Sequence, residues 1–466
     1  MIPRRQFLAM PALMLGARGT DARIEELSTT FEDFKYRAPY KFGGKEVDRV
    51  TMLNVRCRMQ SQSGKSAEGF AAMPLGNVWS FPAPDVPYDT TLGAMKALAE
   101  RIAGITRSFR EFAHPLDVNL ELEPEYLKAA AETSRQLNLP QPIPKLCTLV
   151  TASPIDAALY DAFGKMHGRN SFAVAGKEFV HHDLSQYLNG EFRGEYLDRY
   201  IAPQPAKKIR MYHSVGASDP LTGAEITRPI GDGLPETVED WIPYSGVTAL
   251  KIKLNGNDLA WDVDRVASIH QVTGTAQAKR SFRDWIYSLD FNERCPNVQY
   301  LLDFDRRLSE KTPDAFRRVQ YIEQPTARDL AKDRANTMFE AAKLRPVVID
   351  ESLTGLDALL LAREMGYTGV ALKACKGMSQ TLLLAAAAQK YKMFRCVQDL
   401  TCPGAALVQS VGIAAHIPGV SALEANAREY VPSASRGWEK RYPGIFNVRD
   451  GYIDTAGLEG PGLGTG

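Results

Sequence analysis

Eight short apolar segments recur between residues 209 and 425, and each has the length and composition of a buried β-strand. They are IRMYHS (209–214), ALKIKL (249–254), VQYLLDF (298–304), VQYIE (319–323), PVVID (346–350), GVALK (369–373), MFRCVQD (393–399) and VSALEA (420–425). The interval from Lys253 to Asp303 is twice as long as the others, which predicts an insertion around Thr273 to Pro296. The repetition favours a (β/α)8-type barrel over an open sheet, and the nearly unbroken apolar strands are typical of a parallel sheet buried on both faces.

The N-terminal part of the chain has a different, α+β pattern. Residues 23 to about 45 are polar and mixed, which indicates a linker or an ordered arm, and residues 47–82 indicate a β-hairpin. Helical periodicity follows in residues 89–110 and 123–137, and Ser153 before a proline has the form of a helix N-cap. We therefore expect a signal-like segment (1–22), an N-terminal α+β domain with a connector (23–204), the barrel (205–430) and a tail that packs back on the N-terminal domain (431–466).

The first residues resemble a twin-arginine export signal. Arg4 and Arg5 precede Phe7, Leu8 and an apolar run over residues 9–17 that is too short to span a bilayer. The alternative is a disordered basic start of the kind common in soluble proteins. We expect a periplasmic protein if the segment is a signal, and a cytoplasmic one otherwise.

Charge and cysteine content exclude several classes of protein. The net charge is +1, so no overall field attracts nucleic acid or a membrane surface, and no other segment has the length of a membrane span. The six cysteines include no Cys-x-x-Cys pair, which gives no support to a cysteine-ligated zinc site.

The second to sixth segments each carry an ionisable residue at or next to their C-terminal end, in the order base, acid, acid, acid, base: Lys253, Asp303, Glu323, Asp350 and Lys373. The active site of a (β/α)8 barrel lies at the C-terminal ends of its strands, so these side chains would meet at one mouth. Buried charges are costly unless they pair or bind a metal, and carboxylates on adjacent strands, about 4.8 Å apart, can converge on one ion. Oxygen-only ligands predict a hard cation, Mg2+, held by Asp303, Glu323 and Asp350.

Two lysines would flank this cation. Side chains alternate along a strand, so Lys251 and Lys253 project to the same side, and the Lys251 ammonium should lower the pKa of Lys253 toward that of a general base. Alternatively, Lys251 pairs with a carboxylate. Lys373 would face Lys253 across the mouth. The arrangement suits removal of the α-proton of a carboxylate substrate to give an enediolate, with the second lysine returning a proton to the opposite face.

With these residues the chain resembles the enolase superfamily, and within it the mandelate racemase/muconate lactonizing enzyme group of the two-lysine type. Lys251 and Lys253 match the Lys-x-Lys motif of the group, Lys373 matches its lysine on the sixth strand, and YIEQP and DES match the contexts of the second and third metal ligands. The resemblance implies that the N-terminal domain caps the barrel, that Mg2+ is the cofactor, that the substrate is a small carboxylate and that the chain forms a homo-oligomer.

The implied reaction is that of a racemase or epimerase. A lyase, dehydratase or lactonizing cycloisomerase on the same core is the alternative, and a non-catalytic binding protein that retained the fold is the alternative from another class. The chain departs from the group at Asp305, where asparagine is frequent two residues after the first ligand, and at Lys376-Gly377-Met378, which lacks the usual glycine pair. Glu424-Ala425-Asn426 replaces the Asp-x-Asp of dipeptide epimerases and gives no support to a dipeptide substrate.

Several further residues are candidates for contact with the substrate. Asp399, Glu424 and Asn426 follow the last two predicted strands, where they would bind substrate or form structural pairs, and Trp79 would reach the site from a loop of the N-terminal domain. We expect Lys376 to be solvated or capping because it is out of phase with Lys373, and we expect the His181-His182-Asp183 cluster to be a surface loop or helix start.

Overall fold

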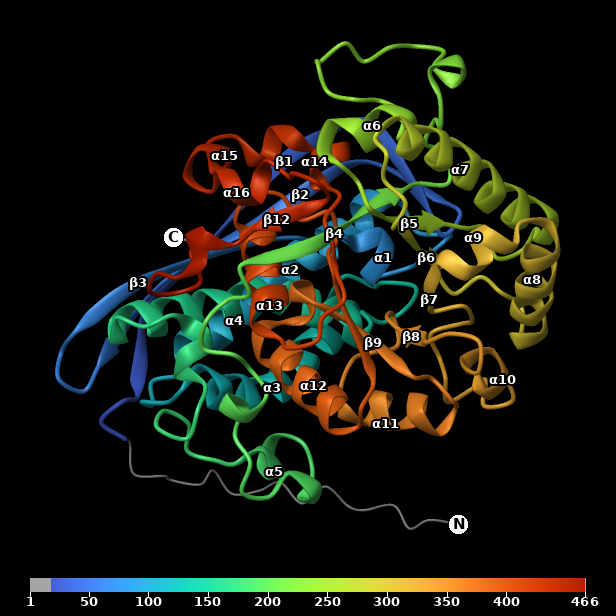
Figure 1. The fold of residues 1–466 in the computed structure, drawn as a ribbon. Coiled ribbons are helices and arrows are strands. Elements are labelled where there is room, and N and C mark those ends of the chain that lie inside the picture. Colours follow the sequence, from blue (N-terminus) through green and yellow to red (C-terminus); the bar gives the residue numbers. More distant parts are fainter. Residues whose placement is uncertain (1–17, 466) are drawn as a thin grey trace.

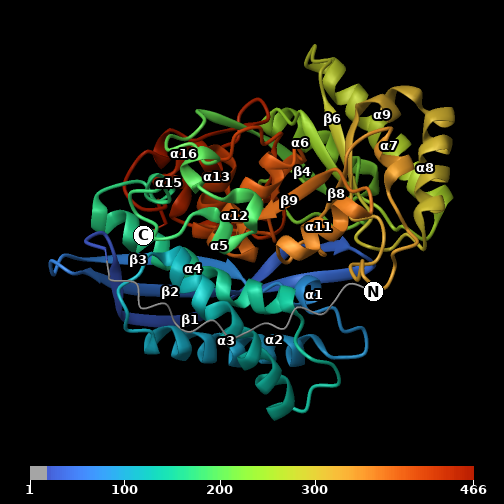
Figure 2. The same cartoon turned by 90° about the horizontal axis from the view of Figure 1, so that it is seen from below.

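The computed structural model describes residues 18–465, so most of the predicted signal segment lies outside the described residues. The chain forms a closed eight-stranded parallel barrel and a separate N-terminal domain built on an antiparallel sheet (Figure 1). Figure 2 shows the sheet lying between the barrel and the helices α2 (Tyr88–Ser108) and α3 (Pro115–Gln136). The predicted fold class, a (β/α)8-type barrel with an α+β domain before it, is confirmed.

The sheet of the N-terminal domain has three strands in the order β1 (Ala22–Phe42), β2 (Lys45–Ser61) and β3 (Ser66–Pro74). The hairpin expected in residues 47–82 is present as β2 and β3, with tight pairing from Met52 and Pro74 to Gln60 and Ser66. The prediction of a linker or arm before it is wrong, because β1 pairs with β2 along almost its whole length. As an edge strand it is half-exposed, and its polar composition follows from that position.

Helix α4 (Lys145–His167) connects the two domains through its packing. It contacts β2 and β3 on one side and α12 (Met378–Lys390) of the barrel domain on the other. Small residues allow the close approach: a Cβ added to Gly69 would lie 2.1 Å from the Ala158 carbonyl oxygen. The predicted N-cap at Ser153 is wrong. Ser153 and Pro154 lie inside the helix, where the Ser153 hydroxyl donates to the Val150 carbonyl 2.8 Å away.

Short elements complete the N-terminal domain and the connector. They are α1 (Asn77–Ser80), η1 (Ser171–Val174), α5 (Leu184–Tyr187), η2 (Gly190–Phe192) and η3 (Leu197–Arg199). Asp183 caps α5 by accepting a hydrogen bond from the Ser185 backbone N–H, and His181 pairs with Asp21 at 2.7 Å. The expectation of a helix start at this cluster therefore agrees with the structure.

The barrel strands follow one another in chain order, and pairing of the last with the first closes the ring. The strands are β4 (Lys208–Val215), β5 (Ala249–Lys253), β6 (Ile286–Asp290), β7 (Val319–Glu323), β8 (Val347–Ile349), β9 (Gly369–Lys373), β10 (Phe394–Gln398) and β11 (Leu423–Glu424). The helices and turns between them are η4 (Gly223–Glu225), α6 (Val238–Ser245), α7 (Leu259–Lys279), α8 (Val298–Lys311), α9 (Pro313–Arg318), α10 (Phe339–Ala342), α11 (Leu356–Glu364), η5 (Ala374–Lys376), α12 and α13 (Ala405–His416).

Seven of the eight predicted strands correspond to strands of the barrel, and the third was misplaced. Residues 298–304 form the start of α8, and the third strand is β6, inside the region predicted to be an insertion. Helix α8 begins at an N-cap, since the Asn297 side chain accepts from the Tyr300 N–H at 3.0 Å, and it buries Leu301, Phe304 and Leu308 at helical spacing. The chain therefore has no insertion here.

The barrel interior is built in layers. The lower layer is apolar and consists of Tyr212, Ala249, Tyr321, Val348, Ala371, Cys396 and Ala422. Two residues further along most of the same strands, the inward positions carry the ionisable or amide side chains Lys251, Glu323, Asp350, Lys373, Gln398 and Glu424. Alternation along each strand thus directs the polar layer to the C-terminal mouth, as expected for this class of barrel.

The C-terminal segment passes over the barrel and reaches the N-terminal domain. It contains α14 (Ala427–Tyr430), η6 (Pro432–Ser435), α15 (Trp438–Arg441), α16 (Pro443–Phe446), β12 (Tyr452–Asp454) and η7 (Ala456–Leu458), with β12 antiparallel to β4. Near its end, the Leu463 N–H donates to Asp161 of α4 at 2.8 Å. Across residues 18–465, no helix combines the length and apolarity needed to cross a bilayer.

Asp156 provides a test of the contact between the two domains. From α4 it accepts hydrogen bonds from the Ser379 N–H at 2.8 Å and the Ser379 hydroxyl at 2.9 Å, and so caps the first turn of α12. Asp156→Ala should lower the free energy of unfolding by about 2 kcal/mol, as measured by urea denaturation.

The same substitution should have a pH-dependent effect. Burial raises the pKa of Asp156 to about 6. A carboxyl group whose pKa is higher in the folded state contributes stability that is present at low pH and is lost as the pH rises through about 6. The destabilisation caused by Asp156→Ala should therefore be larger at pH 4.5 than at pH 7.5, and a larger effect at the higher pH would contradict this account.

Candidate active site

A cavity lies between the N-terminal domain and the C-terminal mouth of the barrel. Its lining on the barrel side is polar and includes Lys253, Lys373, Asp399, Glu424 and Asn426. Its aromatic lining comes from the N-terminal domain and includes Tyr36, Tyr40, Phe42, Trp79 and Tyr88. The cavity is thus apolar toward the cap and charged toward the barrel, which is typical of a small-molecule site.

Three carboxylates end consecutive strands at this mouth: Asp290 on β6, Glu323 on β7 and Asp350 directly after β8. Asp290 and Glu323 are register partners on neighbouring strands. All three are buried. They occupy the positions for which the sequence predicted metal ligands, although the first of them is a different residue.

Asp303, the predicted first ligand, does not reach the site. It lies on α8, its side chain is 38% exposed, and its ion-pair partner is Arg306 one helical turn away at 3.8 Å. Asp290 takes its place, and Asn292 stands two residues later, as is frequent in the group that the sequence resembles. Asp305, which stood in the sequence comparison where the group frequently has asparagine, is therefore not the corresponding residue. It lies on α8 and pairs with Arg345 at 3.5 Å.

Lys251 lies at the centre of the charged layer. Its ammonium is 2.9 Å from Glu323, 2.8 Å from Glu424 and 3.2 Å from Asp290. Of the two roles considered from the sequence, pairing with carboxylates is therefore the main one. Lys253, one layer nearer the cavity, contacts Asp290 at 2.5 Å.

Two further lysines hold Asp350. The Lys373 ammonium is 2.8 Å from Oδ2, and Lys376 is 3.0 Å from Oδ1 and 2.6 Å from the backbone carbonyl. The expectation of a solvated Lys376 is wrong: it is 2% exposed, and the 3-10 turn η5 returns it to the side on which Lys373 points. Asp350 is thus enclosed by two ammonium groups.

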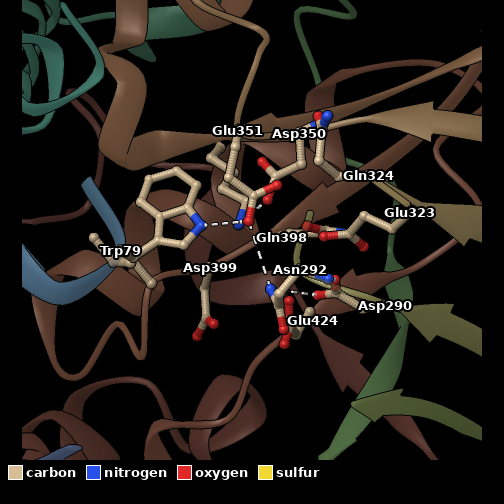
Figure 3. A network of polar contacts seen from close by, with 12 residues as sticks. Trp79, Asp290, Asn292, Glu323, Gln324, Asp350, Glu351, Gln398, Asp399 and Glu424 are labelled. Carbon is tan, nitrogen blue, oxygen red and sulfur yellow. Dashed lines mark hydrogen bonds and ion pairs between the residues drawn. The ribbon is translucent and has the colours of Figure 1, made fainter. Parts of the chain in front are cut away.

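The acidic layer is linked to the N-terminal domain by a hydrogen-bonded chain (Figure 3). The Trp79 indole N–H donates to Glu351 at 2.9 Å, and the Asn292 amide lies 3.5 Å from the same oxygen. Asn292 also donates to Asp290 at 3.3 Å. Glu351, next to Asp350, therefore joins the cap residue Trp79 to the ends of β6 and β8.

Two glutamines that sequence reasoning missed position the carboxylates. The Gln398 amide donates to Glu323 and, at 3.2 Å, to the Tyr321 hydroxyl. The Gln324 side chain accepts from the Asp350 N–H at 2.9 Å, and its backbone has φ +29°, a sparsely populated conformation for a non-glycine residue. The inward position of Gln398 on β10 was the one sequence signal that could have identified it.

The charge balance of the cluster fits a divalent cation. Six buried carboxyl groups (Asp290, Glu323, Asp350, Glu351, Asp399 and Glu424) face four buried lysines (Lys251, Lys253, Lys373 and Lys376), so two negative charges would be left over if every carboxyl group were ionised. Burial, followed by the charge of Asp290, raises the pKa of Glu323 well above its usual value, and burial with Asp350 raises the pKa of Glu351 to about 8. Among residues 18–465, however, no three histidine, cysteine, aspartate or glutamate side chains are close enough together to hold one metal ion while the lysines occupy these positions.

The lysines are held in their charged form by these partners. Burial lowers the pKa of Lys253, but Asp290, with smaller contributions from Tyr40 and Glu424, raises it above the usual value, and Lys251 lowers it by less than Asp290 raises it. Burial likewise lowers the pKa of Lys373 and Asp350 raises it, and the resulting pKa lies above the usual value. The predicted depression of the Lys253 pKa by Lys251 is therefore present only as a minor contribution.

Asp399, Glu424 and Asn426 lie together at the far side of the cavity. Asp399 accepts from the backbone N–H groups of Thr401 and Cys402 at 3.2 Å and from that of Asn426 at 3.3 Å. Burial, then the charge of Glu424, raises the pKa of Asp399 to about 7. These groups are placed to contact a bound molecule, but they also have structural partners.

Comparisons with known proteins were made for sequence families and for solved structures. The model of the family described as "Enolase C-terminal domain-like" matches residues 234–466. Comparison with curated protein sequences found no match.

Several solved structures share the fold over nearly the whole chain. Muconate lactonizing enzyme from Pseudomonas fluorescens, complexed with muconolactone, is 16% identical, with a TM-score of 0.59 over 96% of this chain and 97% of that one. Dipeptide epimerase from Enterococcus faecalis V583, complexed with Mg and L-Leu-L-Tyr, is 13% identical, with a TM-score of 0.62 over 95% and 99%. N-succinyl Arg/Lys racemase from Bacillus cereus ATCC 14579 is 16% identical, with a TM-score of 0.61 over 95% of each chain.

The family match covers half of the chain and includes seven of the eight barrel strands together with every lysine and carboxylate of the charged layer. The structural matches extend the likeness to the N-terminal domain. The chain belongs to the enolase superfamily, in the mandelate racemase/muconate lactonizing enzyme group.

Proposed function

We propose that the protein removes the α-proton of a small carboxylate substrate with the help of Mg2+, and that it acts as a racemase or epimerase. The observation that carries the proposal is the position of two lysines around three carboxylates. Lys253 ends β5 and Lys373 ends β9, four strands apart in a closed ring of eight, so they approach the cavity from opposite walls. Asp290, Glu323 and Asp350 lie on the three strands between them.

Asp290, Glu323 and Asp350 would hold the cation, as the oxygen-only donor set and the excess negative charge favour. When bound, Mg2+ polarises the substrate carboxylate and stabilises the charge that develops on it when the α-proton leaves. Lys253 and Lys373 would give up their contacts with Asp290 and Asp350 if those carboxylates held the cation, and each lysine could then exchange a proton with the substrate.

The two lysines divide the proton transfers between them. One accepts the α-proton at its Nζ, and the other, as an ammonium, delivers a proton to the opposite face of the same carbon. The configuration is thereby inverted. The aromatic residues Tyr40, Phe42 and Trp79 cover the cavity on the cap side and would exclude water from the exchanging protons.

The same core can support elimination or ring closure when the substrate carries a leaving group or acceptor at the β-carbon. A lyase, a dehydratase or a cycloisomerase is therefore the second candidate within the superfamily. A non-catalytic binding protein is less well supported, because binding a carboxylate does not require a buried lysine on each of two facing walls.

The reaction class can be tested by NMR in deuterated water. Purified protein with Mg2+ would be incubated with acid sugars, N-acylated amino acids and dipeptides. We expect exchange at the α-carbon together with inversion, whereas loss of water or ring closure would assign the lyase or cycloisomerase reaction. No exchange by a protein that binds Mg2+ would favour the binding protein.

Substitution of either lysine should stop inversion. Lys253→Ala and Lys373→Ala should each lower the rate of inversion by roughly 1,000-fold or more, because one of the two proton transfers then lacks its group. Lys279→Ala is the matched control: Lys279 lies at the end of α7 in an exposed ion pair with Glu239 of α6, and its loss should leave the rate unchanged. Full activity of either site variant would refute the assignment of two bases.

A matched pair of aspartate variants tests the metal ligands. Asp290→Asn should weaken Mg2+ binding by roughly 100-fold or more, because a ligand charge is lost, whereas Asp303→Asn should have no effect. Isothermal titration with MgCl2 measures both without a substrate. Equal affinities for the two variants would show that Asp290 is not a ligand.

A further inference from the structure

Trp79 belongs to the N-terminal domain but lies within the charged layer of the barrel. It is 6% exposed, although it comes from the one-turn helix α1 in the loop after β3. Its ring centroid is 4.4 Å from the Lys373 ammonium and 5.8 Å from that of Lys376. Its indole N–H donates to Glu351, as Figure 3 shows. Trp79, a residue of the cap, thus contacts both Lys373, which pairs with Asp350, and Glu351, which follows Asp350 in the chain.

A cation bound to Asp350 would compete with the two lysine ammonium groups that now contact its carboxylate oxygens. The Lys373 ammonium lies 2.8 Å from Oδ2, and Lys376 lies 3.0 Å from Oδ1. A divalent cation needs at least one of these oxygens and repels both ammonium groups. Lys376 retains a second acceptor, the backbone carbonyl of Asp350 at 2.6 Å. Lys373 has no such alternative among its hydrogen-bond and ion-pair contacts within residues 18–465, so it is the group most readily displaced.

The Trp79 ring is already in place to hold the displaced group. Indole gives the strongest of the side-chain cation–π contacts, and such a contact strengthens in a water-poor site. The ring is held to the charged layer as well as to the cap, because Glu351 accepts a hydrogen bond from the Trp79 indole N–H at 2.9 Å and also lies 3.5 Å from the Asn292 amide. Movement of Lys373 onto the ring therefore requires no rearrangement of Trp79.

The two lysines differ in this respect. Lys253, on the opposite wall, has Phe42 as its aromatic neighbour at 5.9 Å. Phe42 lacks a hydrogen-bond donor and is not tied to a residue next to a carboxylate ligand. The cap therefore provides a fixed cation–π site at the lysine of β9, and a more distant contact without an anchor at the lysine of β5.

We propose that Trp79 is a positioning residue that receives the Lys373 ammonium when a divalent cation binds to Asp350. Metal binding is thereby coupled to the attachment of the cap loop that carries Trp79 to the barrel. The inference rests on the proposed metal site. It predicts that Mg2+ strengthens the contact between Trp79 and Lys373, and that Mg2+ binds more weakly when the ring is removed, since the displaced ammonium then lacks a partner.

The experiment uses the full chain and MgCl2 alone, so that no substrate is needed. Isothermal titration gives the dissociation constant for Mg2+, and intrinsic fluorescence reports on the indole rings. Trp79→Leu removes the ring, and Trp79→Phe keeps an aromatic face without the N–H. Phe42→Leu is the matched control at the other lysine. Trp285→Phe is the control for the fluorescence signal, because the Trp285 ring packs 3.6 Å from the guanidinium of Arg318 on α9.

We expect Trp79→Leu to weaken Mg2+ binding by about 3- to 30-fold and Trp79→Phe to have an intermediate effect, whereas Phe42→Leu changes it less than 2-fold. The change in fluorescence on adding Mg2+ should persist in Trp285→Phe and disappear in Trp79→Phe. Hydrogen exchange should show that Mg2+ protects residues 75–82 in the wild type but not in Trp79→Leu. Circular dichroism confirms that each variant is folded.

The inference is overturned if Trp79→Leu binds Mg2+ as tightly as the wild type, or if the fluorescence change survives in Trp79→Phe. In that event a wild-type protein that binds Mg2+ leaves the proposed function intact. A wild-type protein that does not bind Mg2+ at all overturns both.

Discussion

The structure depends on a buried layer of opposite charges at the mouth of the barrel. Lys251 touches three carboxylates that come from β6, β7 and β11, so one ammonium group joins strands on different sides of the ring. Each of these charges would be strongly unfavourable alone at such a depth. Together they neutralise one another through the ion pairs between ammonium and carboxylate groups. The same interaction therefore orders the strand ends around the cavity.

The cap completes this layer as well as covering it. Trp79 donates a hydrogen bond to Glu351, and Phe42 and Tyr40 lie on the side of Lys253, so both walls of the cavity receive aromatic groups from the N-terminal domain. The α4 contacts at Asp156 and Asp161 hold the domain against α12 and the C-terminal segment. The distances at the site thus depend on packing far from it.

Much of the architecture could be predicted from the sequence, because strand periodicity and charge at strand ends are local signals. Glu323, Asp350, Lys253 and Lys373 were placed correctly at the ends of four strands. The third strand was misassigned because VQYLLDF carries an acid next to its end and has the composition of a strand, although its apolar residues repeat with helical spacing. Tyr287 and Leu289 point outward from β6, and the Asp-x-Asn that follows them was the better signal.

Other features of the site had no local signal. The inward turn of Lys376 depends on a 3-10 turn that continues β9, and the contact of Trp79 with Glu351 joins residues 272 positions apart. Edge position explains the failure at β1, whose polar residues face solvent along a strand that pairs on one side only. Such long-range relations are fixed by packing between domains, which a single sequence does not specify.

The seam of the barrel is formed by β11, which has only two residues and carries Glu424. It is also the last barrel strand to leave the ribosome, because protein synthesis runs from the N-terminus. Until it emerges, Lys251 lacks one of its three carboxylate partners and the ring has two open edges. A nascent or prematurely terminated chain that lacks β11 therefore has neither a closed sheet nor the full set of ion pairs around Lys251, so assembly of this site is confined to molecules that extend past Glu424.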